Sequence, residues 1–408
     1  MSVEGTAEPA TTTENGHCPR CAEPYLAGDR YCENCSADLL ASGTQRPEPP
    51  QRAEQPAPVD PGEARDVRPA AGGLARACGT CGGRIAPDGY CETCGAPAVR
   101  ERDHWSEQPA PWVAAVCDRG LKHSRNEDAV ALSASPDQGQ LAALVVCDGV
   151  SSSTDSDLAS LAAARAARDV LIRPATPSPS IAGRISGWTD QLTAAAQAAG
   201  EAVLKITAAQ ALSANGPAKG VARGRNATIS PPSCTFVAAV VDGPVIVAGW
   251  VGDSRAYWLP DGAPAEQLSV DDSWATEQIQ RGLSREQAEA SPQAHAITRW
   301  LGEDSPGFDP RCAATIPNGP GWLLVCSDGL WNYCSAAPDL AGLVGGIADE
   351  VGGDPLKAAT ELVSWANQQG GHDNITVALA RLETPVPGSP DAPDDPADLL
   401  DSDPPAER

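Results

Sequence analysis

The sequence predicts a mixed α/β domain of stacked, partly antiparallel sheets covered by helices, preceded by two small cysteine-rich modules. Three observations lead to this prediction. Apolar runs of strand length end in Asp-Gly pairs, long Ala-rich segments repeat with helical periodicity between them, and two C-x2-C pairs occur twice near the N-terminus. The 408 residues are enough for one large core and additional small modules.

The first cysteine-rich module spans residues 17–40 and the second spans 77–98. Each carries two C-x2-C pairs, separated by ten residues in the first copy and nine in the second. This spacing is typical of a tetrahedral zinc ion held by four cysteines, and such short segments would draw their folding free energy from the metal. Pairing within each copy is the simplest scheme, although one pair from each copy could be exchanged. The predicted ligands of two structural zinc ions are Cys18, Cys21, Cys32, Cys35, Cys78, Cys81, Cys91 and Cys94.

The segments around these modules have the composition of linkers. Residues 41–76 are rich in Pro, Ala, Glu and Arg and have almost no bulky apolar side chain, which predicts an extended tether. Residues 1–16 and the acidic segment 384–408 are predicted to be disordered. A second linker is predicted over 99–111, and the main domain over 112–383.

Charge and hydropathy disfavour several classes of protein. The formal net charge of −25 argues against nucleic-acid binding, which needs clustered Lys and Arg. No apolar stretch approaches the roughly 20 residues that span a bilayer, and the N-terminus lacks the basic and apolar regions of a secretory signal. We therefore expect a cytoplasmic protein with no membrane partner, whose cysteines are metal ligands and buried thiols rather than disulfides.

Within the main domain, apolar runs predict strands and Ala-rich runs predict helices. Strand runs end at Gly149 and Gly329, three more follow one another over 234–259, and NITVALARL closes the domain. The Asp242-Gly243 pair between two β-branched runs predicts a hairpin. Helical periodicity is found over 157–172, 190–212, 284–290 and 355–369.

Acidic residues stand at the ends of these strand runs, where packing alone does not place them. Asp148 and Asp328 each precede a glycine, Asp253 follows AGWVG, and Asp373 precedes the last strand. One Asp after a strand is usually a turn residue, but several at strand ends can hold a hard divalent cation such as Mg2+ or Mn2+. The candidate set is Glu127, Asp128, Asp148, Asp253, Asp328 and Asp373.

The motifs RNEDA, VCDGV, GDSRAY, CSDGLW and HDNITV follow one another along the chain. In order and spacing they resemble the metal-dependent (type 2C) Ser/Thr protein phosphatases, over roughly residues 112–383. Residues 268–304 also resemble that family's mobile flap and its Arg-x-x-Gly element. The resemblance implies a four-layer α-β-β-α sandwich and an enzyme acting on phosphoproteins, with Ser/Thr kinases or their substrates as partners.

The resemblance further implies a dinuclear Mn2+ or Mg2+ centre that activates water to hydrolyse phosphoserine and phosphothreonine, without a cysteine nucleophile. Asp148 would bridge the metals, and the Gly149 carbonyl would add an oxygen. A third, looser metal would lie at Asp253. The other ligands, direct or through waters, would be Glu127, Asp128, Asp328 and Asp373.

Two positions depart from the family pattern. His123 stands where the family usually has a phosphate-binding Arg, and an imidazole offers one donor and is charged only when protonated. The segment VSSSTDSDLAS follows Asp148-Gly149 in place of a Gly-rich turn. Its serines could hydrogen-bond waters or substrate, or cap the next helix, and we favour capping. The predicted catalytic residues are His123, Asp148, Asp328 and Asp373. The predicted phosphate contacts are His123, Arg125 and Asn374, with Arg119 and Lys122 as further basic candidates.

The sequence leaves two other interpretations open. Loss of the phosphate-binding Arg would fit a pseudophosphatase scaffold, although the complete acidic set argues against it. Alternatively, the zinc ribbons are the main functional part, and the chain is an adaptor that binds protein or nucleic acid. We favour the phosphatase, with tethered ribbons that raise the local concentration of a partner.

Overall fold

The computed structural model describes residues 16–17, 24–25, 77–78, 81–86, 90–95, 98, 100–173, 178–214, 230–284, 287–288, 291, 293–294 and 296–383. It divides the chain into two compact units, Met1–His104 and Trp105–Arg408. Of the first cysteine module it describes only strands β1 (Gly16–His17) and β2 (Pro24–Tyr25), which pair antiparallel. The predicted tether 41–76, the acidic segment 384–408 and most of the predicted helix 284–290 lie outside the described residues.

Two sheets form the middle of the larger unit. The six-stranded sheet has the order β11-β10-β14-β15-β4-β3 and the five-stranded sheet the order β13-β9-β8-β6-β5, while β7 and β12 form a small ladder of their own. In chain order the strands are β3 (His104–Ala110), β4 (Val113–Asp118), β5 (Ala129–Ala134), β6 (Leu141–Cys147), β7 (Ser233–Cys234), β8 (Phe236–Asp242), β9 (Val245–Val251), β10 (Arg255–Pro260), β11 (Glu266–Gln267), β12 (Leu301–Gly302), β13 (Arg311–Thr315), β14 (Gly321–Cys326) and β15 (Ile375–Leu382).

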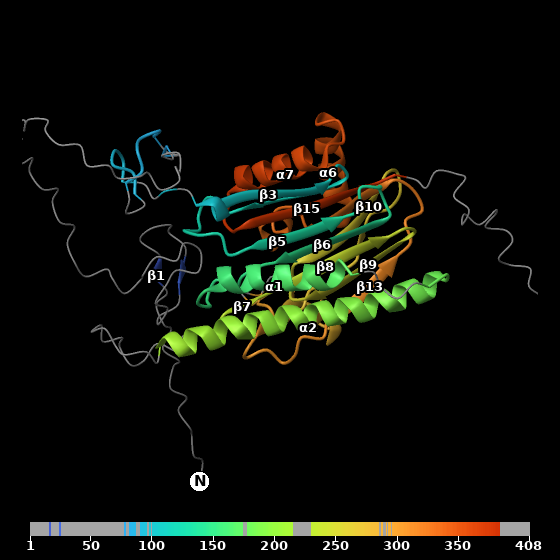
Figure 1. Cartoon of the computed structure of the whole chain (residues 1–408), viewed down its shortest axis with the longest axis horizontal. Coiled ribbons are helices and arrows are strands. Elements are labelled where there is room, and N and C mark those ends of the chain that lie inside the picture. The colour runs from blue at the N-terminus through green and yellow to red at the C-terminus, as the bar shows by residue number, and fades with distance from the viewer. Residues whose placement is uncertain are drawn as a thin grey trace, which may run out of the picture. The chain divides into compact units, whose positions relative to one another are not determined.

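Helices cover the outer face of each sheet (Figure 1). α1 (Ser156–Leu171) and α2 (Ile181–Ala214) pack on the five-stranded sheet, whereas α6 (Ala337–Glu350) and α7 (Pro355–Gln369) pack on the six-stranded sheet. The shorter helices are η1 (Glu101–Asp103), α3 (Trp274–Gln280) and α5 (Asp328–Trp331). This is the four-layer α-β-β-α sandwich that the resemblance implies. No helix in the described part of the chain combines the length and apolar character needed to cross a membrane.

Three apolar layers hold the sandwich together, and β6 shows how one strand serves two of them. Leu144 lies in the core between the sheets, while its neighbour Val145 lies in the core under α1. Successive side chains of a strand point to opposite faces, so a strand buried on both faces has a continuous apolar sequence. On α1, the fully buried Ala159, Ala163 and Ala167 recur every fourth residue, and these small side chains let the helix approach the sheet closely.

Most of the predicted elements are confirmed. The Asp242-Gly243 hairpin joins β8 to β9, with Gly243 at a φ of 56°, where glycine is unstrained. α7 has the predicted bounds because Asp354 caps it, accepting hydrogen bonds from the backbone N–H groups of Leu356 and Lys357, and Gly370 follows its last turn. Helix α6, which contains the Gly345-Gly346 pair, was not predicted.

The predicted linker over 99–111 is wrong for most of its length, because residues 104–110 form β3 at the edge of the six-stranded sheet. The strand was not recognised in the sequence because it contains polar residues and Pro109. Both are common in edge strands, where the backbone on one side has no neighbouring strand to pair with. The Glu107 carboxylate accepts a hydrogen bond of 2.8 Å from the backbone N–H of Leu132 in β5, the edge strand of the other sheet. Desolvation raises the pKa of Glu107. This strand therefore belongs to the sandwich.

Replacing Leu144 by alanine should lower the free energy of unfolding by about 2–5 kcal/mol, because the side chain is fully buried between the sheets and the change leaves a cavity. Leu212→Ala is the matched control, since that leucine is 78% exposed, and it should change the free energy by less than about 0.5 kcal/mol. Chemical denaturation of the full chain measures both. Equal effects of the two substitutions would contradict the placement of Leu144.

Candidate functional site

The acidic residues predicted from the sequence lie at one end of the sandwich, where strands of both sheets begin and end. We call this end the acidic edge. Glu127 and Asp128 precede β5 and Asp148 follows β6 in the five-stranded sheet, and the register pairs the first residue of β5 with the last of β6. Asp328 follows β14, and Asp373 comes before β15, in the six-stranded sheet. Antiparallel pairing places the end of one strand beside the start of the next, which gathers these side chains.

The carboxylates at this edge are close enough to raise one another's pKa. The pKa of Asp148 lies well above its ordinary value, first because its carboxylate is desolvated and then because Asp128 and Asp328 carry like charge. Desolvation followed by the charges of Asp373 and Asp253 raises the pKa of Asp328 in the same way. Among the described residues, no Arg or Lys forms an ion pair with Asp148, Asp253, Asp328 or Asp373. Ion pairs with lysine or arginine therefore do not neutralise the charge of these four carboxylates.

Asp128 connects the two sheets at this edge. It is fully buried, and its Oδ2 accepts hydrogen bonds of 2.7 Å from Ser327 Oγ and from Thr376 Oγ1. Both hydroxyls belong to the six-stranded side of the sandwich, whereas Asp128 precedes β5. Desolvation raises the pKa of Asp128 to about 6, and the two hydroxyls oppose that shift.

Glu127 is held by polar side chains on its own loop and on α1. Arg125 donates to Glu127 Oε1 from Nε at 2.9 Å and from Nη2, and Ser156 Oγ donates to the same oxygen. Ser160, one turn later, donates to the Glu127 carbonyl. The predicted role of the serines as helix caps is wrong, because the N-cap of α1 is Asp155, at a φ of 50° and with no capping bond from its side chain.

His123 is buried between two of the carboxylates, with 6% of its surface exposed. Its Nε2 lies 3.3 Å from Asp373 Oδ1, and its Nδ1 lies 3.9 Å from Glu127 Oε2. The imidazole therefore faces two predicted metal ligands.

Asn374 fastens the loop before β5 to β15. Its Nδ2 donates to the carbonyls of Arg119 at 2.7 Å and Arg125 at 3.1 Å, and its Oδ1 accepts from the Glu127 N–H at 2.7 Å. Both amide N–H groups are used by the protein, so this side chain keeps no donor for a phosphate.

The two Asp-Gly pairs let neighbouring backbones approach closely. A Cβ on Gly149 would lie 2.6 Å from the Glu127 carbonyl oxygen, and one on Gly329 would collide with the Asn374 carbonyl. The Asp328 carboxylate beside Gly329 accepts a hydrogen bond of 3.0 Å from Asn332 on Oδ2. Its buried Oδ1 has no hydrogen-bond partner among the described residues.

Asp253 lies in the connection from β9 to β10, where the chain crosses from one sheet to the other. Arg255, two residues on, pairs with both oxygens of Asp271 at 2.8 and 2.7 Å, and its guanidinium carbon lies 3.6 Å from the ring centroid of Trp331. Trp331 belongs to the helix that begins at Asp328, so Arg255 connects these two acidic segments. The pKa of Asp253 rises to about 7, chiefly through desolvation and then through the charge of Asp271.

This set of donors suits hard divalent cations. Mg2+ and Mn2+ prefer oxygen ligands, and the edge offers mutually repelling carboxylates together with an unpartnered oxygen on Asp328. The residues that fit such ions are Glu127, Asp128, Asp148, Asp253, Asp328, Asp373 and the backbone carbonyl of Gly149.

Sequence reasoning missed the neutral side chains that hold these carboxylates in place. They are Ser156, Ser327, Asn332 and Thr376. Ser and Asn are common near strand ends, so their spacing gives no signal of its own. Only the position of Ser327 next to Asp328 could have pointed to a supporting role.

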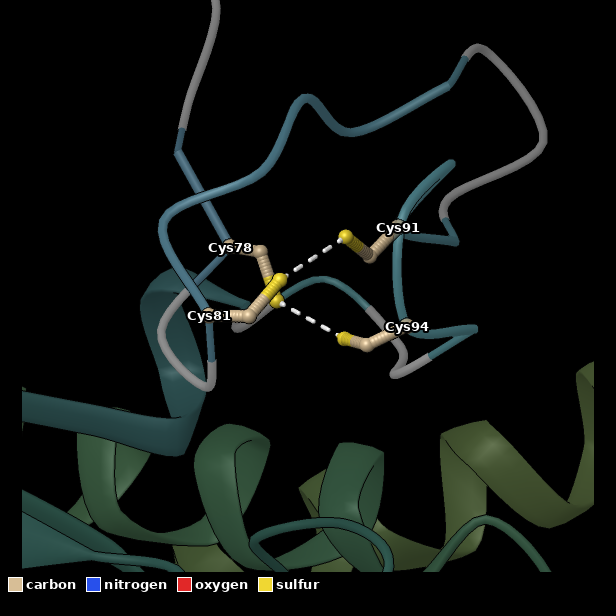
Figure 2. A group of neighbouring side chains, drawn as sticks. All are labelled: Cys78, Cys81, Cys91 and Cys94. Carbon is tan, nitrogen blue, oxygen red and sulfur yellow. Dashed lines mark hydrogen bonds between the residues drawn. The ribbon is translucent and has the colours of Figure 1, made fainter.

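The second cysteine module forms a compact cluster of four sulfur atoms (Figure 2). The Sγ atoms of Cys78, Cys81, Cys91 and Cys94 all lie within 4.8 Å of one another. Cys78 Sγ is 3.6 Å from Cys94 Sγ, and Cys81 Sγ is 3.5 Å from Cys91 Sγ. These distances far exceed a disulfide bond of about 2.05 Å. They are close to the separation of about 3.8 Å that zinc–sulfur bonds of about 2.3 Å give in a tetrahedron.

The glycine after each cysteine pair of this module has the same conformation and the same hydrogen bond. Gly82 and Gly95 each follow the second cysteine of a pair at a φ of 71°, where glycine is unstrained. Their N–H groups donate to the carbonyls of Cys78 and Cys91 at 2.8 and 2.9 Å. The repeated sequence is thus a repeated structure, and Figure 2 shows the two turns directing their sulfurs toward one another. The four cysteines of the first module lie outside the described residues.

Comparison with known proteins gives consistent similarities. The model of the protein phosphatase 2C family matches residues 120–365. Protein phosphatase PhpP of Streptococcus pneumoniae is 39% identical over 149 residues, which are 36% of this chain and 56% of that protein. The chain thus spans about half the length of the curated relatives it matches.

Solved structures show the same fold. The serine/threonine phosphatase of S. agalactiae superposes with a TM-score of 0.50 at 22% identity, covering 68% of this chain and 100% of that one. The serine/threonine phosphatase PstP/Ppp of Mycobacterium tuberculosis gives a TM-score of 0.50 at 24% identity, covering 66% of this chain and 98% of that one. At sequence identities of 22% and 24%, this similarity shows a shared fold.

Without divalent cations, raising the pH should destabilise the larger unit. The pKa of Asp128 is about 6 and that of Asp253 about 7, above the ordinary value near 4. A carboxyl whose pKa is raised by folding stabilises the folded state while protonated, so this contribution is complete below about pH 4 and is lost as the pH rises through about 7. Thermal unfolding with a chelator should therefore give a Tm that falls between about pH 5 and pH 8, and Mg2+ or Mn2+ should raise it most at the higher pH. A Tm that rises over this range and ignores the cations would contradict the shared charge at this edge.

Proposed function

The chain belongs to the protein phosphatase 2C family, and from this we propose that it hydrolyses phosphoserine and phosphothreonine in proteins. The observation that carries the proposal is the group of mutually repelling carboxylates around Asp148 and Asp328. In the proposed reaction, water attacks phosphorus, the bond to the side-chain oxygen breaks, and inorganic phosphate and the free hydroxyl leave. A cysteine nucleophile would not fit, because Cys147 and Cys326 are fully buried and desolvation raises the pKa of each thiol.

The carboxylates at the edge would hold two Mn2+ or Mg2+ ions. Asp148 would lie between them with the Gly149 carbonyl beside it, Asp328 and Asp373 would complete the pair, and Asp253 would serve a third, looser ion. When bound, the ions would supply the Lewis acidity that activates water and neutralises phosphoryl oxygens. Glu127 and Asp128 would support the pair directly or through waters.

Of the three predicted phosphate contacts, Arg125 has the most support from the side-chain contacts. Arg125 engages Glu127 through Nε and Nη2, which leaves Nη1, 3.9 Å from Asp157, on a side chain that is 36% exposed. We propose Arg125 as the phosphate contact, because guanidinium donors suit phosphate oxygens. His123, buried against Asp373, would orient that carboxylate, and Asn374 would fix the loop that carries Arg125.

The cysteine modules would act as zinc ribbons that recruit a partner to the catalytic unit. The sulfur geometry of the second module supports one zinc ion, and the matching spacing of the first module supports another. Ser/Thr kinases or their phosphorylated substrates are the proposed partners, in the cytoplasm. Tethering would raise their local concentration at the phosphatase unit.

Asp148→Asn and Asp328→Asn should each reduce hydrolysis of a phosphothreonine peptide by several orders of magnitude, because an amide cannot supply the charge that holds the metal pair. Activity of the full chain should require added Mn2+ or Mg2+, stop with a chelator and survive thiol alkylation. Asp349→Asn, at an exposed position on α6, is the control and should retain activity. A folded wild-type chain that binds the phosphopeptide without turnover in Mn2+ would instead support the pseudophosphatase scaffold.

Elemental analysis should find about two zinc ions per chain. Cys81→Ser and Cys91→Ser should each remove one, since either change breaks the cluster of four sulfurs. Cys334→Ser is the control, because that cysteine lies in the larger unit, and it should leave the zinc content unchanged. If the zinc content stayed the same in Cys81→Ser and Cys91→Ser, the proposal that the second module binds zinc would be wrong.

A further inference from the structure

A pocket adjoins the acidic edge of the sandwich. Its volume is about 230 Å3, and its lining residues are Gly329, Asn332, Tyr333, His372 and Asp373. Gly329 and Asp373 belong to the acidic segments themselves. The pocket therefore opens beside the place where the proposed reaction would cleave the phosphate ester.

His372 forms an exposed wall of this pocket, and the backbone behind it fixes its position. The backbone N–H of His372 donates a hydrogen bond of 3.0 Å to Tyr333 Oη. Gly370, at a φ of 149°, lies directly against the ring, because a Cβ there would be 2.5 Å from His372 Cδ2 and 3.2 Å from Tyr333 Oη. Glycine at this position creates the space that the imidazole occupies.

Tyr333 is fixed in turn by Trp365 of α7. The two rings meet edge to face, with centroids 6.4 Å apart and an interplanar angle of 87°. The side chains of this wall are thus positioned before any ligand arrives, which lowers the entropy cost of binding.

Leu121 contacts Gly371, the residue that precedes His372. It is 62% exposed, and its backbone N–H donates to the Gly371 carbonyl at 2.9 Å. Its side chain lies against Gly371, where a Cβ would be 2.7 Å from Leu121 Cγ. A single exposed leucine is ordinary, but this one is held next to an exposed aromatic wall.

We propose that Leu121, Asn332, Tyr333 and His372 form a flanking-chain site, which binds the polypeptide next to the phosphorylated residue. This inference rests on the proposed function. The Asn332 carboxamide offers a hydrogen bond to a main chain, and the rings of His372 and Tyr333 together with Leu121 offer contact to a neighbouring side chain. An extended peptide advances by about 3.3 Å per residue, so a chain bound at the edge reaches the adjoining pocket within one or two residues.

The test compares two substrates that differ only in the flanking chain: a phosphothreonine peptide of about ten residues and a single phosphothreonine capped at both ends. In His372→Ala and Leu121→Ser, the ratio of kcat/KM for the peptide to that for the capped residue should fall roughly five- to tenfold. The fall should come mainly from KM, because these contacts exist equally in the ground and transition states. Tyr333→Phe, which removes the hydroxyl that holds His372, should give a smaller fall in the same direction.

Ile172→Ser is the matched control, since this exposed aliphatic residue follows the C-terminal end of α1, away from the turn that contacts Glu127. In this variant, the ratio of kcat/KM for the peptide to kcat/KM for the capped residue should equal the wild-type ratio. An unchanged ratio in both His372→Ala and Leu121→Ser, with the wild type active on both substrates, would overturn the flanking-chain site and leave the phosphatase proposal intact. A parallel loss on both substrates would overturn it as well, because the effect would then not depend on the flanking chain. A wild-type chain inactive on both substrates in Mn2+ would defeat the proposed function itself.

Discussion

Repulsion among carboxylates at one edge of the sandwich is the constraint on which the rest of the site depends. The pKa values of Asp148 and Asp328 are raised because each group is desolvated among like charges. Arg125 holds Glu127, but the fold restrains Asp128 and Asp328 with neutral donors, Ser327 on Asp128 and Asn332 on Asp328. An arginine in their place would neutralise the charge and compete with a cation, whereas a hydroxyl or an amide fixes the geometry and leaves the charge in place.

The same edge depends on links between the two sheets. Asp128 accepts hydrogen bonds from Ser327 and Thr376 across the sandwich. Asp128, which precedes β5, is thereby positioned by elements of the other sheet. On the six-stranded side, Arg255 at the start of β10 joins the segment after Asp253 to Trp331 in α5. The flanking-chain site adjoins this edge, since His372 directly precedes Asp373.

The acidic residues and the cysteine cluster of the second module could be predicted because strand ends and C-x2-C spacing are visible in the sequence. The other parts depend on contacts that no spacing reveals. Pro109 and the polar residues around it concealed edge strand β3. Asn374 was predicted to contact phosphate, but its amide is used by the loop beside it. The position of His372 depends on the φ of Gly370 and on a tyrosine far away in the sequence.

The central claim is that this repulsion makes the edge a divalent-metal centre, and anomalous scattering from crystals grown with Mn2+ tests it most directly. If the claim is right, two manganese peaks should lie at the edge, both in contact with the Asp148 carboxylate, with Asp328 and Asp373 completing their coordination. An edge without manganese, in which Asp148 and Asp328 instead hydrogen-bond to protein donors, would contradict it.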